Sequence, residues 1–190
     1  MITSVATVSL RLPIRTVRLF LRDLELHDLD AIHAYASDPE VTRYMFYGPR
    51  TEADTRDYLD RMIASQREVP RMVWELGVLL AGDRRLVGTC DLALEKPDEG
   101  DLGFIFSPDV WGRGYATEAA RAMVRAGFEQ LGLTRIVATC NVSNTASAHV
   151  LEKAGLQREA TLEDHRFAKG VWWTSFMYAI QRDRWSAEAW

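Results

Sequence analysis

Two glycines, Gly112 and Gly114, stand between an apolar run and a stretch with helical spacing, within the segment 101–119, DLGFIFSPDVWGRGYATEA. Glycine lets the backbone approach a ligand closely, and the start of a helix presents unpaired N–H groups and a partial positive charge. Such a turn suits a pyrophosphate, although a turn that binds nothing is the alternative. Neither GxGxxG nor GxxxxGK[ST] can be read here, which disfavours a dinucleotide or mononucleotide module.

The strand before this turn belongs to a group of three short apolar runs. They are Met72–Leu80, Arg85–Leu94 and Asp101–Phe106, and turn residues separate them at 81–83 and 96–100. We therefore expect antiparallel strands joined by hairpins. Other strands are expected at Arg18–Arg22, Thr134–Cys140 and Val171–Ile180.

Four helices are expected from apolar residues at spacings of three and four. The first runs from about Leu26 to Pro39, and the second starts after Thr51 and stops before Pro70. The third is a long helix that follows Gly114 and ends at Gly132. The fourth spans Asn144–Ala154, with Gly155 as its stop.

Composition favours one domain over residues 1–190, because no repeat, linker or low-complexity tract divides the chain. Lys and Arg number 23 against 27 Asp and Glu, a net charge of −4, so we expect no nucleic-acid partner. Two cysteines, Cys90 and Cys140, and four scattered histidines are too few for a disulfide framework or a zinc site. We expect no metal and a reducing, cytoplasmic location.

Membrane association is also unexpected. The stretch Met1–Leu12 lacks the basic and apolar regions of a secretion signal, and nowhere do about 18 apolar residues follow one another.

The glycine turn resembles a known cofactor loop. Trp111–Ala116, W-G-R-G-Y-A, is similar to the [Q/R]-x-x-G-x-[G/A] loop of GNAT acetyltransferases, with Trp111 in place of the usual Gln or Arg. The longer W-G-R-G-Y-A-T-E-A resembles the ribosomal-protein N-terminal acetyltransferase branch in particular. Segments similar to that branch also occur, in the right order, at 18–22, 37–42, 140–147 and 150–156.

This resemblance implies an α/β (α+β) GNAT fold: a mixed, mostly antiparallel sheet, splayed at two central strands, with helices on both faces. Acetyl-coenzyme A would be the cosubstrate, with its pantetheine arm inserted between the strand 102–106 and the strand 135–140. The implied cofactor-binding residues are the loop and helix-start amides and the edge of the splayed strand: Gly112, Arg113, Gly114, Tyr115, Ala116, Thr117, Phe104, Ile105 and Phe106.

Three further residues take roles from the same resemblance. Asn144 would bond the pantetheine or thioester region, although a helix N-cap is its plain structural role. Ser147 would stand near the sulfur and protonate the leaving thiolate, the alternative being a small helix-surface residue. Asp101, at the start of the splayed strand, would hold the substrate ammonium or relay its proton, and a solvated charge is the alternative.

Other nucleophiles and bases are less expected. Cys140 matches a cysteine of some ribosomal-protein acetyltransferases, but a buried strand residue is the preferred interpretation because direct transfer is the family's mechanism. We interpret His149 and His165 as solvated or packing residues. Aromatic residues gather at 44–47 and 172–178, where the family fold places the walls of the acceptor site.

The resulting hypothesis is an acetyltransferase acting on a primary amine, working as a monomer or homodimer. The acceptor is a protein N-terminus, such as that of a ribosomal protein, or an amine-bearing small molecule such as an antibiotic, a polyamine or an amino-acid-like metabolite. An α-amino group with a pKa of about 7.7–8.0 needs less help from a base than a lysine near about 10.4. A non-catalytic acyl-coenzyme A sensor is the rival of a different class.

Overall fold

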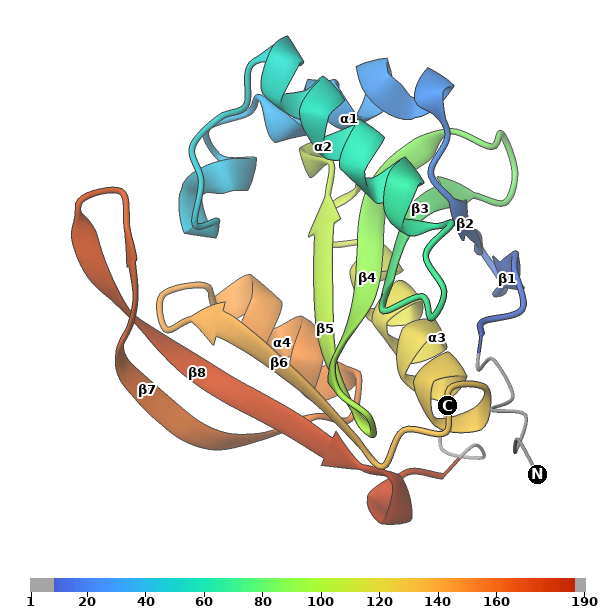
Figure 1. Cartoon of the computed structure of the whole chain (residues 1–190). Coiled ribbons are helices and arrows are strands. Elements are labelled where there is room, and N and C mark those ends of the chain that lie inside the picture. The colour runs from blue at the N-terminus through green and yellow to red at the C-terminus, as the bar shows by residue number, and fades with distance from the viewer. Residues whose placement is uncertain (1–8, 187–190) are drawn as a thin grey trace.

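The computed structural model describes residues 9–186 of the chain (Figure 1). Most of the stretch Met1–Leu12, for which we expected no secretion signal, therefore lies outside the described residues. The strands are β1 Ile14–Arg15, β2 Leu19–Asp23, β3 Val73–Leu80, β4 Leu86–Lys96, β5 Glu99–Phe106, β6 Arg135–Asn141, β7 Gln157–Ala168 and β8 Val171–Gln181. The α-helices are α1 Leu29–Ala36, α2 Glu52–Ser65, α3 Tyr115–Glu129 and α4 Thr145–Lys153, and short 3-10 turns are η1 Leu26–Asp28, η2 Val41–Tyr44, η3 Pro108–Val110 and η4 Arg182–Arg184.

All eight strands join one sheet in the order β1-β2-β3-β4-β5-β6-β8-β7. Every neighbouring pair is antiparallel except β5 and β6, which run parallel. That parallel pairing covers only Glu99 to Asp101, opposite Arg135 to Val137. Figure 1 shows the two halves of the sheet meeting at the start of β5 and β6 and diverging toward the carboxyl ends of these strands. The expected mixed sheet with two splayed central strands is confirmed.

Helices cover both faces of the sheet, as expected. On one face α3 and α4 pack against the sheet, with Met123 and Phe128 of α3 fully buried against Leu76 and Leu92. Burial of each such side chain contributes roughly 1.5–3 kcal/mol. On the other face α1 and α2 form a second core of buried side chains: Leu24, Ile32, Leu59 and Leu79. The sheet thus has a separate hydrophobic core on each of its two faces.

Local signals in the sequence explain most helix boundaries. Thr51 caps α2, accepting from the Asp54 amide while the Asp54 carboxylate accepts from the Thr51 amide, which is a capping box. Gly132 after α3 and Gly155 after α4 adopt positive φ angles of 70° and 82°, as helix stops require. The first expected helix is divided, because η1 precedes α1 and the Asp28 carboxylate accepts from the Glu25 amide.

Three differences from expectation have physical causes. The turn expected over 96–100 is confined to Pro97 and Asp98, and Gly100 lies in β5, where a Cβ would collide with Leu92 and Leu133. The strand β7 was missed because its residues are largely exposed and lack an apolar alternation. The strand β1 was missed because it has only two residues.

Candidate active site

The glycine turn adopts the conformation that its residues suggested. Gly112 and Gly114 have φ angles of 72° and 80°, in the left-handed region where other residues are strained. Gly114 is the N-cap of α3, and the first intrahelical bond joins the Glu118 amide to the Gly114 carbonyl over 3.1 Å. The amides of the first turn, at residues 115–117, precede that bond and are the groups that a helix start offers to an anion.

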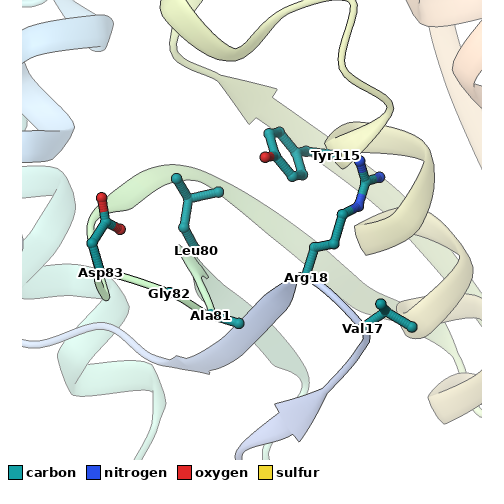
Figure 2. A pocket seen from close by; sticks show the side chains of 7 residues that line it. All are labelled: Val17, Arg18, Leu80, Ala81, Gly82, Asp83 and Tyr115. Atoms are coloured by element: carbon teal, nitrogen blue, oxygen red, sulfur yellow. The ribbon is translucent and has the colours of Figure 1, made fainter.

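Arg18, on the loop before β2, holds this turn in place. Its Nη1 donates to the Arg113 carbonyl over 2.9 Å, and its Nε contacts the Glu118 carboxylate at 2.6 Å. Its guanidinium also lies over the Tyr115 ring, 4.6 Å from the centroid. Figure 2 shows Arg18 and Tyr115 side by side. Both line a hollow of about 500 Å³, together with Val17, Leu80, Ala81, Gly82 and Asp83. Sequence reasoning gave Arg18 no such role.

Trp111 occupies the position where the GNAT loop usually has Gln or Arg. Its indole Nε1 donates to the Phe106 carbonyl over 2.8 Å, so the side chain ties the glycine turn to the end of β5. The indole remains 45% exposed. The departure from the motif therefore replaces a possible ligand contact with an internal brace.

The backbone of β5 beyond Asp101 has no partner in β6. The Ser107 amide donates to the Val87 carbonyl over 2.9 Å, and Phe106 stands opposite Gly88. Because successive peptide groups of a strand point to opposite edges, Ile105 faces β4 while Phe104 and Phe106 face the opening. Phe104 therefore offers both of its peptide groups to a strand added in the opening, and Phe106 offers its amide, since the Phe106 carbonyl accepts from Trp111. Ile105 offers neither group.

Asn144 and Ser147 lie at the start of α4, directly after β6. The Asn144 Oδ1 accepts from the Ser147 amide over 3.1 Å, so the plain role of N-cap is confirmed. The side chains of both residues are half-buried. Because β5 and β6 are parallel, the glycine turn and the start of α4 both follow carboxyl ends at the same edge of the sheet. In open sheets a crevice of this kind, where neighbouring strands diverge, is the usual place for a ligand.

Asp101 is the last residue of β5 that pairs with β6, opposite Val137, and it is half-buried at the base of the opening. Burial, with a smaller contribution from the charge of Glu95, raises the pKa of Asp101 from 3.8 to about 6, in spite of the opposing charge of Arg166. A carboxylate with this pKa is a far better proton acceptor at neutral pH than an ordinary aspartate.

Two more carboxylates lie on the same face of the sheet, under α1 and α2, and sequence reasoning missed both. Glu75 of β3 stands directly opposite Asp91 of β4. Burial raises the pKa of Glu75, and burial together with the charges of Glu75 and Asp101 raises that of Asp91 well above its ordinary value. The available signal was one acidic residue inside each of two otherwise apolar runs.

The last hairpin, β7–β8, contacts the segment between α1 and α2. The rings of Phe46 and Trp173 are 5.7 Å apart, and Lys169 Nζ donates to the Thr42 carbonyl over 2.7 Å. The Arg166 guanidinium lies over the Phe46 ring, 4.0 Å from its centroid. The two aromatic segments therefore contact each other, and their role as walls of the acceptor site stays a prediction.

Other candidate groups are poorly suited to chemistry. Cys140 is only 7% exposed, and burial raises the pKa of its thiol to about 11, so the thiolate is scarce at neutral pH. His149 is exposed, and His165 is half-buried. Within residues 9–186 no three His, Cys, Asp or Glu residues are grouped as a metal site would require. No described helix is long and apolar enough to cross a bilayer.

Comparisons with known proteins agree with this geometry. The profile of the acetyltransferase (GNAT) domain family matches residues 18–157. The uncharacterized N-acetyltransferase YnaD of Bacillus subtilis is 30% identical over 174 residues, which are 91% of this chain and 99% of YnaD. The spermidine N(1)-acetyltransferase of Escherichia coli K12 is 28% identical over 169 residues, 88% of each chain.

Solved structures give the same picture. An acetyltransferase of the GNAT family from Bacillus anthracis superimposes with a TM-score of 0.82 and 33% identity, covering 90% of this chain and 99% of that one. Spermidine N-acetyltransferase from Vibrio cholerae, in complex with CoA and spermine, gives 0.76 and 22% over 89% and 98% of the two chains. The ribosomal L7/L12 α-N-protein acetyltransferase RimL, in complex with coenzyme A, gives 0.79 and 17% over 90% and 99%. The last two likenesses concern the fold alone.

Proposed function

We propose that this chain, which belongs to the acetyltransferase (GNAT) family, transfers an acetyl group directly to a primary amine bound on the face of the sheet under α1 and α2. It is an acyltransferase, and acetyl-coenzyme A is its cosubstrate. The observation that carries the proposal is the opening between β5 and β6, with the glycine turn at its edge and a carboxylate of raised pKa at its base. We also propose that residues 1–190 form one domain and act in the cytoplasm.

The cofactor side of the proposal uses mainly backbone groups. Amides of the turn and helix start, from Gly112 to Thr117, would hold the pyrophosphate of acetyl-coenzyme A. Peptide groups of Phe104 and Phe106 would pair with the amides of the pantetheine arm, as in an added strand. The side-chain Nδ2 of Asn144 remains available to the arm, since its Oδ1 already accepts from the Ser147 amide.

The acceptor side uses side chains. A neutral amine nitrogen attacks the thioester carbonyl carbon, the carbon–sulfur bond breaks, and coenzyme A leaves as a thiolate. Asp101 would hold the incoming ammonium and take the proton that the amine loses, directly or through water. The Ser147 hydroxyl would donate a hydrogen bond or proton to the departing sulfur. No covalent enzyme intermediate is needed, in accord with the buried, protonated thiol of Cys140.

The acceptor is a small amine in our preferred version. The carboxylates of Glu75, Asp91 and Asp101 lie on the side of the sheet that α1 and α2 cover. This concentration of acidic groups favours a cationic acceptor. A protein N-terminus, such as that of a ribosomal protein, is the second candidate, favoured by the W-G-R-G-Y-A-T-E-A loop. Similar proteins include both kinds of enzyme.

Parallel assays would test the proposal. Purified chain, acetyl-coenzyme A and a panel of small amines and N-terminal peptides would be incubated, and acetylated products identified by mass spectrometry. We expect transfer to the amine nitrogen of at least one small amine. Tight binding of acetyl-coenzyme A without transfer to any acceptor would instead indicate an acyl-coenzyme A sensor.

A further inference from the structure

Glu75 and Asp91 form a close pair of acidic side chains. The Leu94 amide donates to the Met72 carbonyl, so the register makes Glu75 and Asp91 a non-hydrogen-bonded pair, the kind in which opposite side chains lie closest. Like charges placed directly opposite each other destabilise a sheet. Neither carboxylate has an ion-pair partner within 4.0 Å among the described residues, although both remain partly accessible to solvent. A positively charged ligand between them would remove the repulsion.

Tyr35 of α1 supplies a second, independent observation. Its side chain is only 3% exposed, and its hydroxyl has no hydrogen-bond partner of ordinary geometry, although it faces Glu75 and Thr89. A buried hydroxyl without a partner destabilises the fold. The hydroxyl of Tyr58, from α2, also lies near the Glu75 carboxylate. Hydroxyl groups that can donate hydrogen bonds therefore lie beside the Glu75 carboxylate.

Arg50 does not fill this role. Its guanidinium lies between the rings of Tyr47 and Tyr58, 4.2 and 4.1 Å from their centroids. It is close enough to lower the pKa of Glu75 but forms no ion pair within 4.0 Å with either carboxylate. Arg50 therefore offsets part of the negative charge without forming an ion pair with either carboxylate.

The pair is connected to the reaction centre through Gly103. A Cβ at Gly103 would overlap the Asp91 carboxylate, so the missing side chain lets Asp91 lean over β5. Gly103 lies opposite Asp91, and Asp101 is two residues away on the same face of β5. Asp91 and Asp101 are therefore diagonal neighbours, about 7–8 Å apart. Two acidic positions at this separation match a ligand with two cationic ends.

We propose that Glu75 and Asp91 bind a second cationic group of the acceptor, and that the preferred acceptor is a small aliphatic diamine whose other amine is acetylated beside Asp101. The inference rests on the proposed acetyl transfer. The contact of β7–β8 with the segment between α1 and α2 lies near Asp101, through Arg166, and a slender chain needs less room there than a polypeptide.

The test compares acceptors that differ only in the second charge. Initial rates would be measured with cadaverine and with n-pentylamine, and with putrescine and n-butylamine. We expect kcat/KM of the diamine to exceed that of its matched monoamine by about tenfold or more. Asp91→Asn and Glu75→Gln should each remove most of this preference by raising the diamine KM about tenfold, with less than a twofold change for the monoamine.

Matched controls separate binding from folding. Asp60→Asn removes an exposed carboxylate of α2 that faces solvent and should keep the wild-type preference. Tyr35→Phe, which keeps the ring, should raise the diamine KM a few-fold. Calorimetry of cadaverine and n-pentylamine with the wild-type chain and coenzyme A gives the same comparison without any variant, and we expect tighter binding of cadaverine.

Three outcomes would overturn the inference. Equal kcat/KM for diamines and monoamines in the wild-type chain would leave the carboxylates without a ligand role, and equal losses for both acceptors in Asp91→Asn would make Asp91 a general acceptor-site or structural residue. Transfer to N-terminal peptides but not to diamines would assign the face to a protein acceptor. In all three cases acetyl transfer itself persists, whereas failure with every amine would refute the proposed function as well.

Discussion

The cofactor side and the acceptor side of this molecule are built in different ways. The turn at Gly112 and Gly114, the start of α3 and the free edge of β5 present backbone groups, and their directions follow from φ angles and strand pairing. The acceptor side consists of side chains from three strands and two helices that are distant in sequence. A backbone site is therefore marked by one short motif, whereas a side-chain site depends on register between segments.

This contrast predicts that the affinity for acetyl-coenzyme A depends strongly on a single glycine, Gly114. In Gly114→Asp, a non-glycine residue must adopt φ near 80°, and a negative charge enters the space proposed for the pyrophosphate. The strain lowers folding stability, whereas the repulsion should cost about 3 kcal/mol of binding free energy, so acetyl-coenzyme A should bind roughly 10²-fold more weakly. Isothermal calorimetry measures this affinity directly.

Gly132→Asp is the matched control for that variant. Gly132 has φ of 70° at the other end of α3, and no atom lies within 4 Å of an added Cβ. The control has the same backbone strain and the same new charge far from the glycine turn. If both variants bind acetyl-coenzyme A equally well, the turn is not the pyrophosphate site.

Ser147 joins the two sides, because it lies at the start of α4 and its proposed contact is the sulfur. Ser147→Ala should lower kcat by about 10²-fold, the lower end of the range for general-acid catalysis, and leave cofactor affinity nearly unchanged. Ser143→Ala, an exposed serine outside α4, serves as control. A kcat change of less than about threefold, or a loss confined to acetyl-coenzyme A affinity, would make Ser147 a packing or binding residue.

Asp101 tests the acceptor side by itself. Asp101→Asn removes the charge and should raise the acceptor KM about tenfold, since hydrogen bonds to charged groups contribute about 1.5–3 kcal/mol, with little change for acetyl-coenzyme A. Because the pKa of Asp101 is about 6, the wild-type advantage over Asp101→Asn should be full above pH 6 and should vanish as the pH falls below it. If the ratio of the two kcat/KM values did not change with pH, Asp101 would be a solvated charge without a role in acceptor binding.

Ionised Asp101 should also lower the free energy of unfolding at neutral pH. The pKa of Asp101 is raised on folding, so the folded chain binds more protons than the unfolded chain between about pH 4 and pH 6. The stabilising contribution of this carboxyl is present at low pH and is lost as the pH rises through about 6. Asp101→Asn should therefore be more stable than wild type at pH 7, by at most about 3 kcal/mol, and equal to it near pH 4. Urea unfolding at both pH values measures this difference.

The smallest effect is expected at Cys140. Its thiol is buried and protonated, so Cys140→Ala should change kcat by less than about twofold and leave the acceptor KM unchanged. Its reaction with iodoacetamide at pH 7 should be far slower than that of a free cysteine. A loss of kcat comparable to that of Ser147→Ala would point to an acetylated cysteine and to a two-step mechanism.

The sequence predicted contiguous features well. The glycine turn, the N-cap at Asn144 and the capped start of α2 each lie within a few residues, so neighbouring residue types are enough to predict them. Glu75 and Asp91 were invisible as a pair, because only the β3–β4 register brings them together. The brace from Arg18 was missed for the same reason, since its partners are about a hundred residues away.

The central claim is direct transfer from acetyl-coenzyme A to an amine held across the opening between β5 and β6. Initial rates of coenzyme A release, measured while both acetyl-coenzyme A and the best amine are varied, test it most directly. We predict no release without amine, acetyl recovered on the amine nitrogen, and double-reciprocal plots that intersect. Parallel plots, or release of coenzyme A that does not depend on the amine, would contradict the account.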